Sequence, residues 1–368
     1  MRKYFRFHII LLSALTLLAY QSCKRNDAID NNIVIETPYS LFFSDTGGAL
    51  YATNDGKDVR PLLFPSDGYP SRALCTAGNN ILWVKHNMYY SPVFGGNFNP
   101  NFFWVNDSAV NQTLVLNAAD HDGRVYLAAT DSFTWPDFST NNTYIRGMGV
   151  YISDQNGSPG SFVVDSNYDP VLNSPAPTIS TGIHVTTFTE VQNPPATIYA
   201  YDPYLNRLFY KVGKTGMWTE RKQLVALPQP NAFTLAHFNN ILVAVDYKYG
   251  NGAYYSPDAG GSWIKFTGLP QGRNLFCASS PFDMVLLVGT DSMGVYKLNI
   301  DNTSFSSANV GLTNHTTVKS IAAKENVYKN DGITQQYIYL ATTTGLYRSE
   351  DLGQSWILYR PGNYVSAY

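Results

Sequence analysis

The feature that most constrains this chain is an internal repeat. Residues 79–84 read Asn-Asn-Ile-Leu-Trp-Val and lead into Tyr-Tyr-Ser-Pro and Gly-Gly at 89–96. Residues 239–244 read Asn-Asn-Ile-Leu-Val-Ala and lead into the same two motifs at 254–261. A third copy at 337–356 ends in Ser-Glu-Asp-Leu-Gly-Gln-Ser-Trp. Self-similarity of this kind is typical of folds in which equivalent units stack and bury a shared core.

Weaker copies of the unit begin near residues 50, 150, 208 and 295. Together with the clear copies they recur about every 49 residues, close to the roughly 40–50 residues of a four-stranded propeller blade. Each unit opens with a short strand rich in small residues, which suits the crowded innermost strand of a blade. We therefore predict an all-β fold, a β-propeller of four-stranded blades. Seven blades fit the length of the mature chain, and six or eight remain alternatives.

Composition agrees with many short strands joined by tight turns. Charged residues make up 14% of the 368 residues, beside 28 Gly and 20 Pro, whereas helical proteins carry more Lys, Glu and Arg. No Pro/Ser/Gly-rich linker interrupts the repeats, so residues 37–368 are expected to form a single domain. Because no clear fourth strand follows Gly362, we expect a strand near 33–42 to complete the last blade. The net charge of -2 and the absence of a basic stripe argue against a nucleic-acid partner.

The N-terminus carries a basic segment (1–6), an apolar run (9–19) and then Ser22-Cys23. The run is too short to span a bilayer as a mature helix. The arrangement resembles a bacterial lipoprotein signal peptide, in which the cysteine becomes the lipidated first residue. This resemblance implies a signal peptide at 1–22, lipid on Cys23 and a flexible tether at 23–36. It also implies export to the outer membrane, periplasmic or surface-exposed, with the lipid as the only membrane contact; an ordinary signal peptide with an incidental cysteine is the alternative.

The two remaining cysteines, Cys75 and Cys277, occupy equivalent positions in the inner strands of the second and sixth units. In a seven-bladed ring these units lie nearly opposite each other, too far apart for the Cα separation that a disulfide requires. We predict two free, buried thiols.

Two copies of the turn after the third strand share one pattern, Ser-x-Asp-x-Gly followed by Trp. The Asp can accept backbone N–H bonds within the turn, and the Gly supplies backbone freedom. The pattern resembles the Asp-box (BNR) repeats of sialidase-type propellers. In those families the turn joins the third and fourth strands, remote from the substrate face, which implies a structural role for Ser256, Asp258, Gly260, Trp263, Ser349, Asp351, Gly353 and Trp356.

The resemblance raises the question of sialidase chemistry. Sialidases use three arginines, a Tyr–Glu nucleophile pair and an Asp that acts as the acid/base catalyst. The first arginine lies in a Phe/Tyr-Arg-Ile-Pro motif. The nearest string here is 59–62, Val-Arg-Pro-Leu, which lacks that arrangement, and no glutamate lies in a Glu-Gly-Arg context. We assign no catalytic residue.

Other chemistry is equally unsupported by spacing. A glycosidase requires two carboxylates that face one cleft. The aspartates that follow or end predicted strands, and could form such a pair, are Asp120, Asp122, Asp131, Asp137, Asp202 and Asp246. However, Asp is also an ordinary turn residue. The histidines form no His-x-His or His-x3-His pair. We predict no metal site and no cofactor.

Aromatic residues in connecting segments are the remaining candidates for binding, since they can stack on sugars or anchor a protein. They are Trp104, Trp135, Tyr247 and Tyr249, with packing between blades as the alternative role. A lipid-anchored propeller of this kind resembles surface lipoproteins of Bacteroidota-type bacteria. The leading hypothesis is a non-catalytic lipoprotein that binds a glycan or a protein partner of the cell envelope. A sialidase-like glycoside hydrolase and an assembly-factor-like scaffold are the alternatives.

Overall fold

The computed structural model describes residues 41–53, 59–62, 71, 73–77, 80–84, 88–91, 99–101, 112–121, 124–134, 143–165, 187–191, 196–202, 207–221, 233–327 and 334–368. The chain divides into two compact units. The larger, Ile35–Glu325 with Gln336–Tyr368, contains the sheets. The smaller, Met1–Val34 with Asn326–Gln335, is described only at 326–327 and 334–335.

The regular secondary structure of the described residues consists of strands and one short 3-10 turn, η3 (Pro281–Asp283). Among them, no helix is long and apolar enough to cross a membrane. The strands are β1 (Leu41–Asp45), β2 (Leu50–Thr53), β3 (Arg60–Pro61), β4 (Ala73–Ala77), β5 (Asn80–Val84), β6 (Met88–Ser91), β7 (Asn99–Asn101), β8 (Gln112–His121), β9 (Arg124–Thr134), β10 (Thr143–Ser153), β11 (Val163–Val164), β12 (Thr187–Val191), β13 (Thr197–Asp202), β14 (Arg207–Val212), β15 (Thr219–Arg221), β16 (Phe233–Phe238), β17 (Ile241–Asp246), β18 (Ala253–Ser256), β19 (Ile264–Lys265), β20 (Leu275–Ser279), β21 (Leu287–Thr290), β22 (Val295–Leu298), β23 (Phe305–Ser307), β24 (Val318–Val327), β25 (Thr334–Thr342), β26 (Gly345–Ser349), β27 (Ile357–Pro361) and β28 (Tyr364–Ala367).

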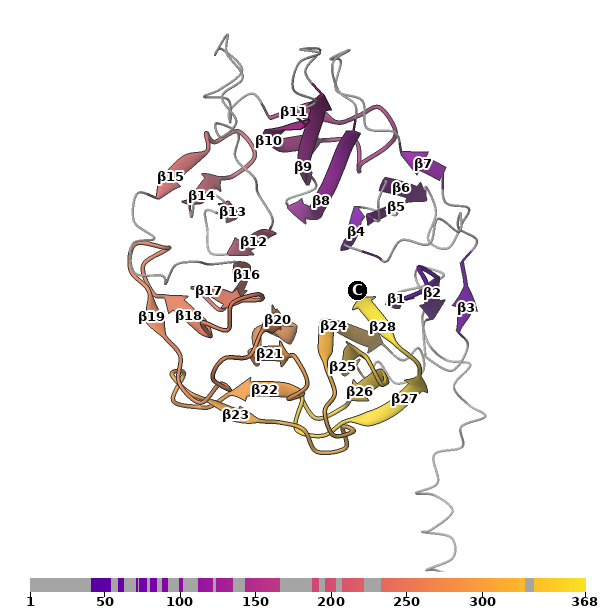
Figure 1. Ribbon diagram of the computed structural model, residues 1–368, viewed down its shortest axis with the longest axis vertical. Coiled ribbons are helices and arrows are strands. Elements are labelled where there is room, and N and C mark those ends of the chain that lie inside the picture. Colours follow the sequence, from indigo (N-terminus) through magenta and orange to yellow (C-terminus); the bar gives the residue numbers. More distant parts are fainter. Residues whose placement is uncertain are drawn as a thin grey trace, which may run out of the picture. The chain divides into compact units, whose positions relative to one another are not determined.

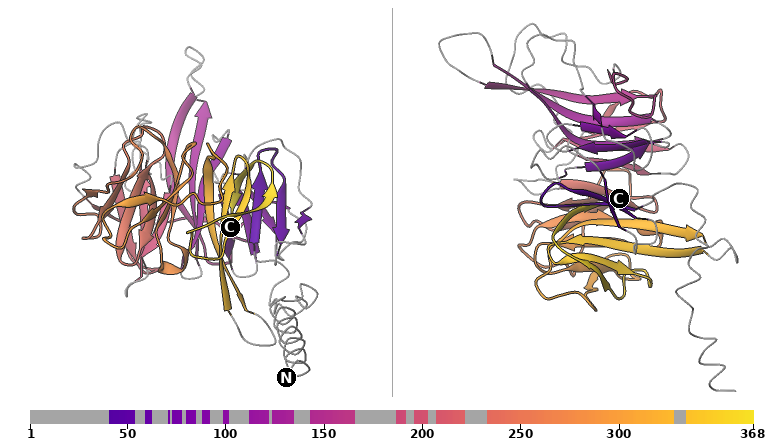
Figure 2. Two further views of the ribbon diagram at one scale, coloured as in Figure 1. Left: turned by 90° about the horizontal axis from the view of Figure 1, so that it is seen from below. Right: turned by 90° about the vertical axis from the view of Figure 1, so that its right-hand side faces the viewer.

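In the described residues these strands form seven four-stranded antiparallel sheets, arranged around a common centre (Figure 1). Six sheets take four consecutive strands each, beginning with β4, β8, β12, β16, β20 and β24. The first strand of each sheet lies nearest the centre, as the small residues of β4 and β20 predict. The propeller architecture inferred from the repeat is therefore confirmed. β9 and β10 are longer than the strands around them and extend beyond one end of the ring (magenta in Figure 2).

The seventh sheet closes the ring, and it corrects one expectation. Its order is β28-β1-β2-β3, so the C-terminal strand is the innermost strand of the first blade. We predicted the reverse, an N-terminal strand completing the last blade. That blade is already complete, because β27 follows Trp356 directly as its fourth strand. The short β28, with Ser366 and Ala367 at its end, fits the crowded central position.

Both backbone and side-chain hydrogen bonds support the pairing of β1 with β28. Backbone bonds link Phe42 and Tyr368 in both directions, at 2.9 and 2.8 Å. The hydroxyl oxygens of Ser44 and Ser366 lie 2.7 Å apart. Ser44 is completely buried, so this contact satisfies a hydroxyl that water does not reach.

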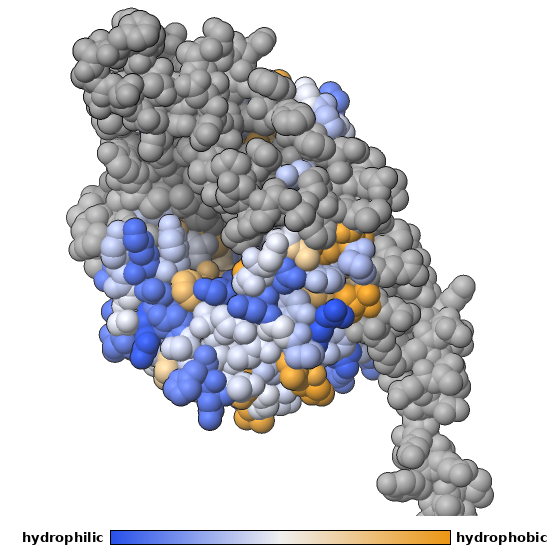
Figure 3. Space-filling model, turned by 45° about the vertical axis from the view of Figure 1, so that its right-hand side comes forward, coloured by the Kyte–Doolittle hydropathy of each residue, from blue (hydrophilic) through white to orange (hydrophobic). Residues whose placement is uncertain are grey.

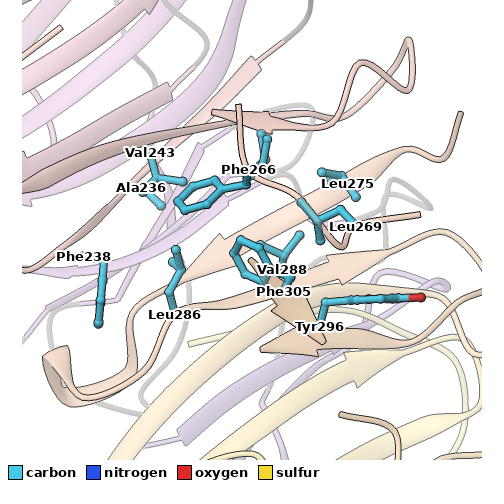
Figure 4. Packing of buried hydrophobic residues seen from close by; sticks show 12 residues of the cluster. Ala236, Phe238, Val243, Phe266, Leu269, Leu275, Leu286, Val288, Tyr296 and Phe305 are labelled. Atoms are coloured by element: carbon cyan, nitrogen blue, oxygen red, sulfur yellow. The ribbon is translucent and has the colours of Figure 1, made fainter. Parts of the chain in front are cut away.

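Apolar side chains fill the spaces between neighbouring sheets. Figure 4 shows one such cluster, in which residues from the sheets that begin with β16 and β20 point toward one another. At its centre the rings of Phe266 and Phe305 meet edge to face, with centroids 5.0 Å apart. Neither Cys75 nor Cys277 forms a disulfide, as predicted. Cys75 is buried as expected, whereas Cys277 is half-buried, and the burial of its thiol raises the pKa to about 12. In the view of Figure 3, hydrophobic residues on the described surface form separate small patches among hydrophilic ones.

A second set of contacts joins the outer strands of the last three complete blades. Thr267 forms a parallel bridge with Ser304, and Val310 forms one with Ser355. Each bridge is followed by a glycine with positive φ, Gly268 at 80° and Gly311 at 88°. A Cβ on Gly268 would overlap the carbonyl oxygen of Phe305, and one on Gly311 that of Trp356. Glycine is therefore required where one blade passes the backbone of the next.

This close approach predicts a difference between two glycine substitutions. Gly268→Ala should cost at least about 2 kcal/mol more than Gly272→Ala, because only the first adds a backbone overlap to the cost of a positive φ. Gly272 has a φ of 66°, but a Cβ added there would meet no other atom within 4 Å. Denaturant unfolding of both variants measures the difference; equal losses would mean that the outer contact does not stabilise the fold.

Candidate ligand-binding surface

Antiparallel strands send successive loops to alternate ends of the ring. The turns after the third strands, 153–161, 256–263 and 349–356, lie at one end, which we call the turn end. The loops 246–252, 266–274, 291–294 and 308–317 lie at the other, which we call the loop end. The predicted structural residues of the turns at 256–263 and 349–356 thus lie at one end, and Tyr247 and Tyr249 lie at the other.

The turn at 256–263 is held by its own side chains. The Ser256 hydroxyl accepts the Gly260 N–H (2.7 Å) and donates to Asp258 (2.8 Å). The Asp258 carboxylate also accepts the Ser262 N–H and hydroxyl, both at 2.7 Å. These bonds, those from Ser262 above all, lower the pKa of Asp258 to about 2.

The turn at 349–356 repeats the same geometry. Gly353 donates its N–H to Ser349 (2.8 Å), and Asp351 accepts the N–H and hydroxyl of Ser355. Burial acts to raise the pKa of Asp351, but the hydrogen bonds from Ser355 and Ser349 outweigh it and bring the pKa to about 2. Both carboxylates therefore stay ionised and committed to their turns at neutral pH.

A third turn of this shape follows the weaker copy of the unit near residue 150, where the sequence analysis assigned no turn residues. Ser153 accepts the N–H groups of Gln155 (3.2 Å) and Gly157 (3.1 Å). Asn156 has a φ of 51° and Gly157 of 69°, matching the positive φ values of the residue pairs at 259–260 and 352–353. Gln155 replaces the aspartate. The detectable signal was Ser-x-x-x-Gly directly after a strand, which is weak without the acid.

Each turn packs against the preceding blade. The turn glycines Gly157, Gly260 and Gly353 face leucines of the neighbouring sheet, Leu82, Leu208 and Leu287 respectively. Lys297 donates to the carbonyl oxygen of Leu352 at 2.8 Å, again across a blade boundary. These contacts make the turns part of the packing between blades.

The two turn tryptophans differ in one hydrogen bond, which gives a test. Trp356 donates its indole N–H to the carbonyl oxygen of Ala308 (2.8 Å), whereas the buried indole nitrogen of Trp263 has no partner among the described residues. Trp356→Phe should therefore destabilise the fold by about 1–3 kcal/mol more than Trp263→Phe, because only the first leaves a buried carbonyl unsatisfied. Thermal unfolding of the two variants measures this. Equal destabilisation would contradict the assigned bond.

At the loop end, Asp246 organises the loop that carries Tyr247 and Tyr249. Asp246 is completely buried, and its carboxylate accepts the N–H groups of Lys248 (2.9 Å), Tyr249 (2.9 Å) and Asn251 (3.2 Å). This aspartate was one of the residues that could have paired as a glycosidase acid. Its oxygens are instead used to shape the loop.

The two tyrosines of this loop differ in exposure. Tyr249 is 43% exposed, and the Lys248 ammonium lies 5.2 Å from the centre of its ring. Tyr247 is half-buried, and burial, followed by the nearby Asp246 carboxylate, raises the pKa of its phenol. Tyr249 is therefore the residue of the pair that presents its ring to solvent.

The loop end is continuous from this loop to the sixth blade. Gly250 packs against the backbone of Gly272 and Arg273. Asn274 and Asp291 exchange hydrogen bonds, with the Asp291 N–H donating to the Asn274 carbonyl (3.0 Å) and the Asn274 N–H donating to the Asp291 carboxylate (3.3 Å). The chain of contacts thus joins the fifth blade to the sixth.

A cation lies where the inner strands of the sixth and seventh blades meet. The Lys319 ammonium is 3.7 Å from the ring centre of Phe276. Burial lowers the pKa of Lys319, while the carboxylate of Asp291 acts in the opposite direction. This pair joins residues of β20 and β24, and nothing in the local sequence predicted it.

The other predicted residues are distributed as follows. Cys23, Trp104 and Trp135 lie outside the described residues, as do Asp122 and Asp137. Asp120, Asp131 and Asp202 lie in strands whose side chains are not described there. His237, at the turn end, approaches Thr189 (3.2 Å) and Asp283 (3.6 Å). In the part of the chain that the structure describes, no three His, Cys, Asp or Glu side chains gather to hold a metal ion.

Comparisons with known proteins support the fold class. No family model and no curated protein matches the sequence. Among solved structures, YCF48 from Cyanidioschyzon merolae has a TM-score of 0.52 at 10% identity, over 84% of this chain and 95% of that one. A structure described as YCF48 bound to D1 peptide gives 0.51 at 10% identity, over 83% and 90%.

The extracellular domain of BT3049 from B. thetaiotaomicron gives a TM-score of 0.52 at 16% identity, over 80% of this chain and 35% of that one. The chain spans about a third of the length of the B. thetaiotaomicron chains that it matches. At these identities the likeness establishes the β-propeller fold and no more.

Proposed function

We propose that this protein is an exported, lipid-anchored and non-catalytic β-propeller that binds a glycan or a protein partner of the cell envelope through its loop end. The observation that carries the proposal is the loop at 246–252. A buried carboxylate fixes its backbone through three hydrogen bonds, and an exposed tyrosine lies at its tip. A rigid loop that presents an aromatic ring binds with little loss of conformational entropy.

The comparisons add support on the partner and the compartment. The YCF48 structure contains a bound peptide, so a propeller of this shape accommodates a protein partner. The B. thetaiotaomicron chains are extracellular domains, which agrees with the export implied by residues 1–22. The hydrogen bonds from Gly260 to Ser256 and from Gly353 to Ser349 support the proposal that the turns at 256–263 and 349–356 are Asp-box repeats.

A binding experiment tests the loop directly. The purified protein is applied to a glycan array and to peptides of envelope proteins, and each hit is measured by calorimetry. Tyr249→Ala should weaken binding about tenfold or more, since loss of a stacked aromatic costs roughly 1–3 kcal/mol. Tyr368→Ala is the matched control, because Tyr368 is 42% exposed, close to Tyr249, and lies at the turn end.

Two results would contradict the proposal. Binding that both variants reduce equally would place the site elsewhere. Turnover of a glycoside by the wild-type protein would contradict the non-catalytic assignment.

The lipid anchor is tested separately at Cys23. Cys23→Ala should abolish incorporation of labelled palmitate and move the protein from the detergent phase to the aqueous phase in a Triton X-114 partition, because the lipid is the proposed membrane contact. Cys75→Ala should change neither result, since Cys75 is buried in an inner strand. Unchanged partitioning of the Cys23 variant would exclude the anchor.

A further inference from the structure

The described loop end carries an excess of cations that are not paired with acids. Lys248 and Arg273 are exposed there, and Lys319 is half-buried against Phe276. Lys265, exposed on the outer strand β19, reaches the same loop, because its side chain lies beside Gly252. The ion pairs among the described residues lie elsewhere, at Arg124–Asp154, Lys211–Asp165, His237–Asp283 and Arg348–Glu350.

The two acids of these loops, Asp246 and Asp291, bond to the protein's own backbone. Asp246 is buried and accepts three backbone N–H groups. Asp291 accepts the Asn274 N–H with one carboxylate oxygen, and its other oxygen is buried. Both carboxylates are thus less accessible to a ligand than the ammonium and guanidinium groups of the exposed cations. The surface that a ligand can contact here is therefore basic.

The turn end carries both acids and cations, among them Lys214 and Lys297. Its described acids include Asp258, Asp301 and Asp351, whose pKa values are all lowered by hydrogen bonds within their turns. A strand of six residues such as β17 spans about 20 Å, which exceeds the screening length of about 8–10 Å in physiological salt. The acids of the turn end therefore do not neutralise the cations of the loop end.

The cations and the exposed ring lie along one continuous line of contacts. Lys248 adjoins the ring of Tyr249, and the same loop packs against Gly272 and Arg273 through Gly250. Asn274 then bonds to Asp291, which lies close enough to Lys319 to influence its pKa. A linear ligand with regularly spaced anionic groups can follow this line, whereas a single small anion can reach only one part of it.

We propose that the ligand of the loop end is an anionic glycan, bound by Arg273, Lys248 and Lys319 through its carboxylate or sulfate groups and by Tyr249 through a sugar ring. This inference rests on the proposed function and adds the chemical class of the ligand. Arginine binds such anions with two parallel hydrogen bonds. Lys319 is partly desolvated, so a charge contact there is stronger than at a fully exposed lysine. The tyrosine ring selects a sugar over an acidic peptide of equal charge.

The test compares four polymers with the full chain by calorimetry at 50 and 500 mM NaCl. Dextran sulfate and polygalacturonate are the anionic glycans, dextran is the matched neutral glycan, and polyglutamate is the anion without sugar. We expect binding of at least one anionic glycan, little of dextran, and a loss of at least tenfold at the higher salt concentration.

Variants separate charge from fold. Arg273→Gln and Lys319→Met should each weaken binding of the anionic glycan about tenfold, as expected for loss of a charge-assisted hydrogen bond. Tyr249→Ala should weaken it similarly but leave polyglutamate unchanged. Lys214→Gln is the control, because it removes one positive charge from the turn between β14 and β15, at the turn end. Unfolding temperatures equal to that of the wild-type protein show that each variant is folded.

The outcomes distinguish the two proposals. A neutral glycan bound through Tyr249, without effect of Arg273→Gln or Lys319→Met, would overturn the anionic class and leave the proposed function intact. Polyglutamate binding as tightly as the glycans, without effect of Tyr249→Ala, would overturn the glycan assignment. Binding reduced equally by Lys214→Gln would show non-specific attraction and overturn the site.

Discussion

The structure depends on the pairing of its first and last described strands. Each blade buries its apolar faces against two neighbours, so an open series of blades would leave the faces at both ends in water. The bonds between β1 and β28 remove those ends, and the Ser44–Ser366 contact joins two residues that face each other in the register of these strands. The packing between the other blades depends on this closure of the ring.

Much of this fold could be predicted because its signals are local and repeated. The Asn-Asn-Ile-Leu and Tyr-Tyr-Ser-Pro segments mark strands that recur at one period, and small residues mark the inner strands. The closure was predicted the wrong way round because a strand's place in a ring depends on how many strands precede it, which a single sequence shows poorly. The strand before the third turn was predicted as a weaker copy of the unit, but the residues of the turn at 153–161 were not assigned because Gln155 replaces the acid that identifies the pattern.

The candidate site was only partly accessible from the sequence. Tyr247 and Tyr249 stood out as aromatics in a connecting segment, but the role of Asp246 beneath them follows from three hydrogen bonds that the sequence does not display. Phe276 and Lys319 belong to strands of different blades, so their stacking arises only from the packing of the ring. The grouping of unpaired cations at the loop end has the same origin, since it requires knowing at which end each loop emerges.

The closing pair also has a consequence for the order in which the chain folds. Ser44 and Ser366 are separated by 322 positions, so β1, β2 and β3 leave the ribosome long before the strand that completes their sheet. Contacts between such distant segments form slowly, because a long loop must close first. Until then the inner edge of β1 is an unpaired strand edge of the kind that associates with other chains. Newly made protein thus passes through a stage at which protection from aggregation must come from outside the molecule.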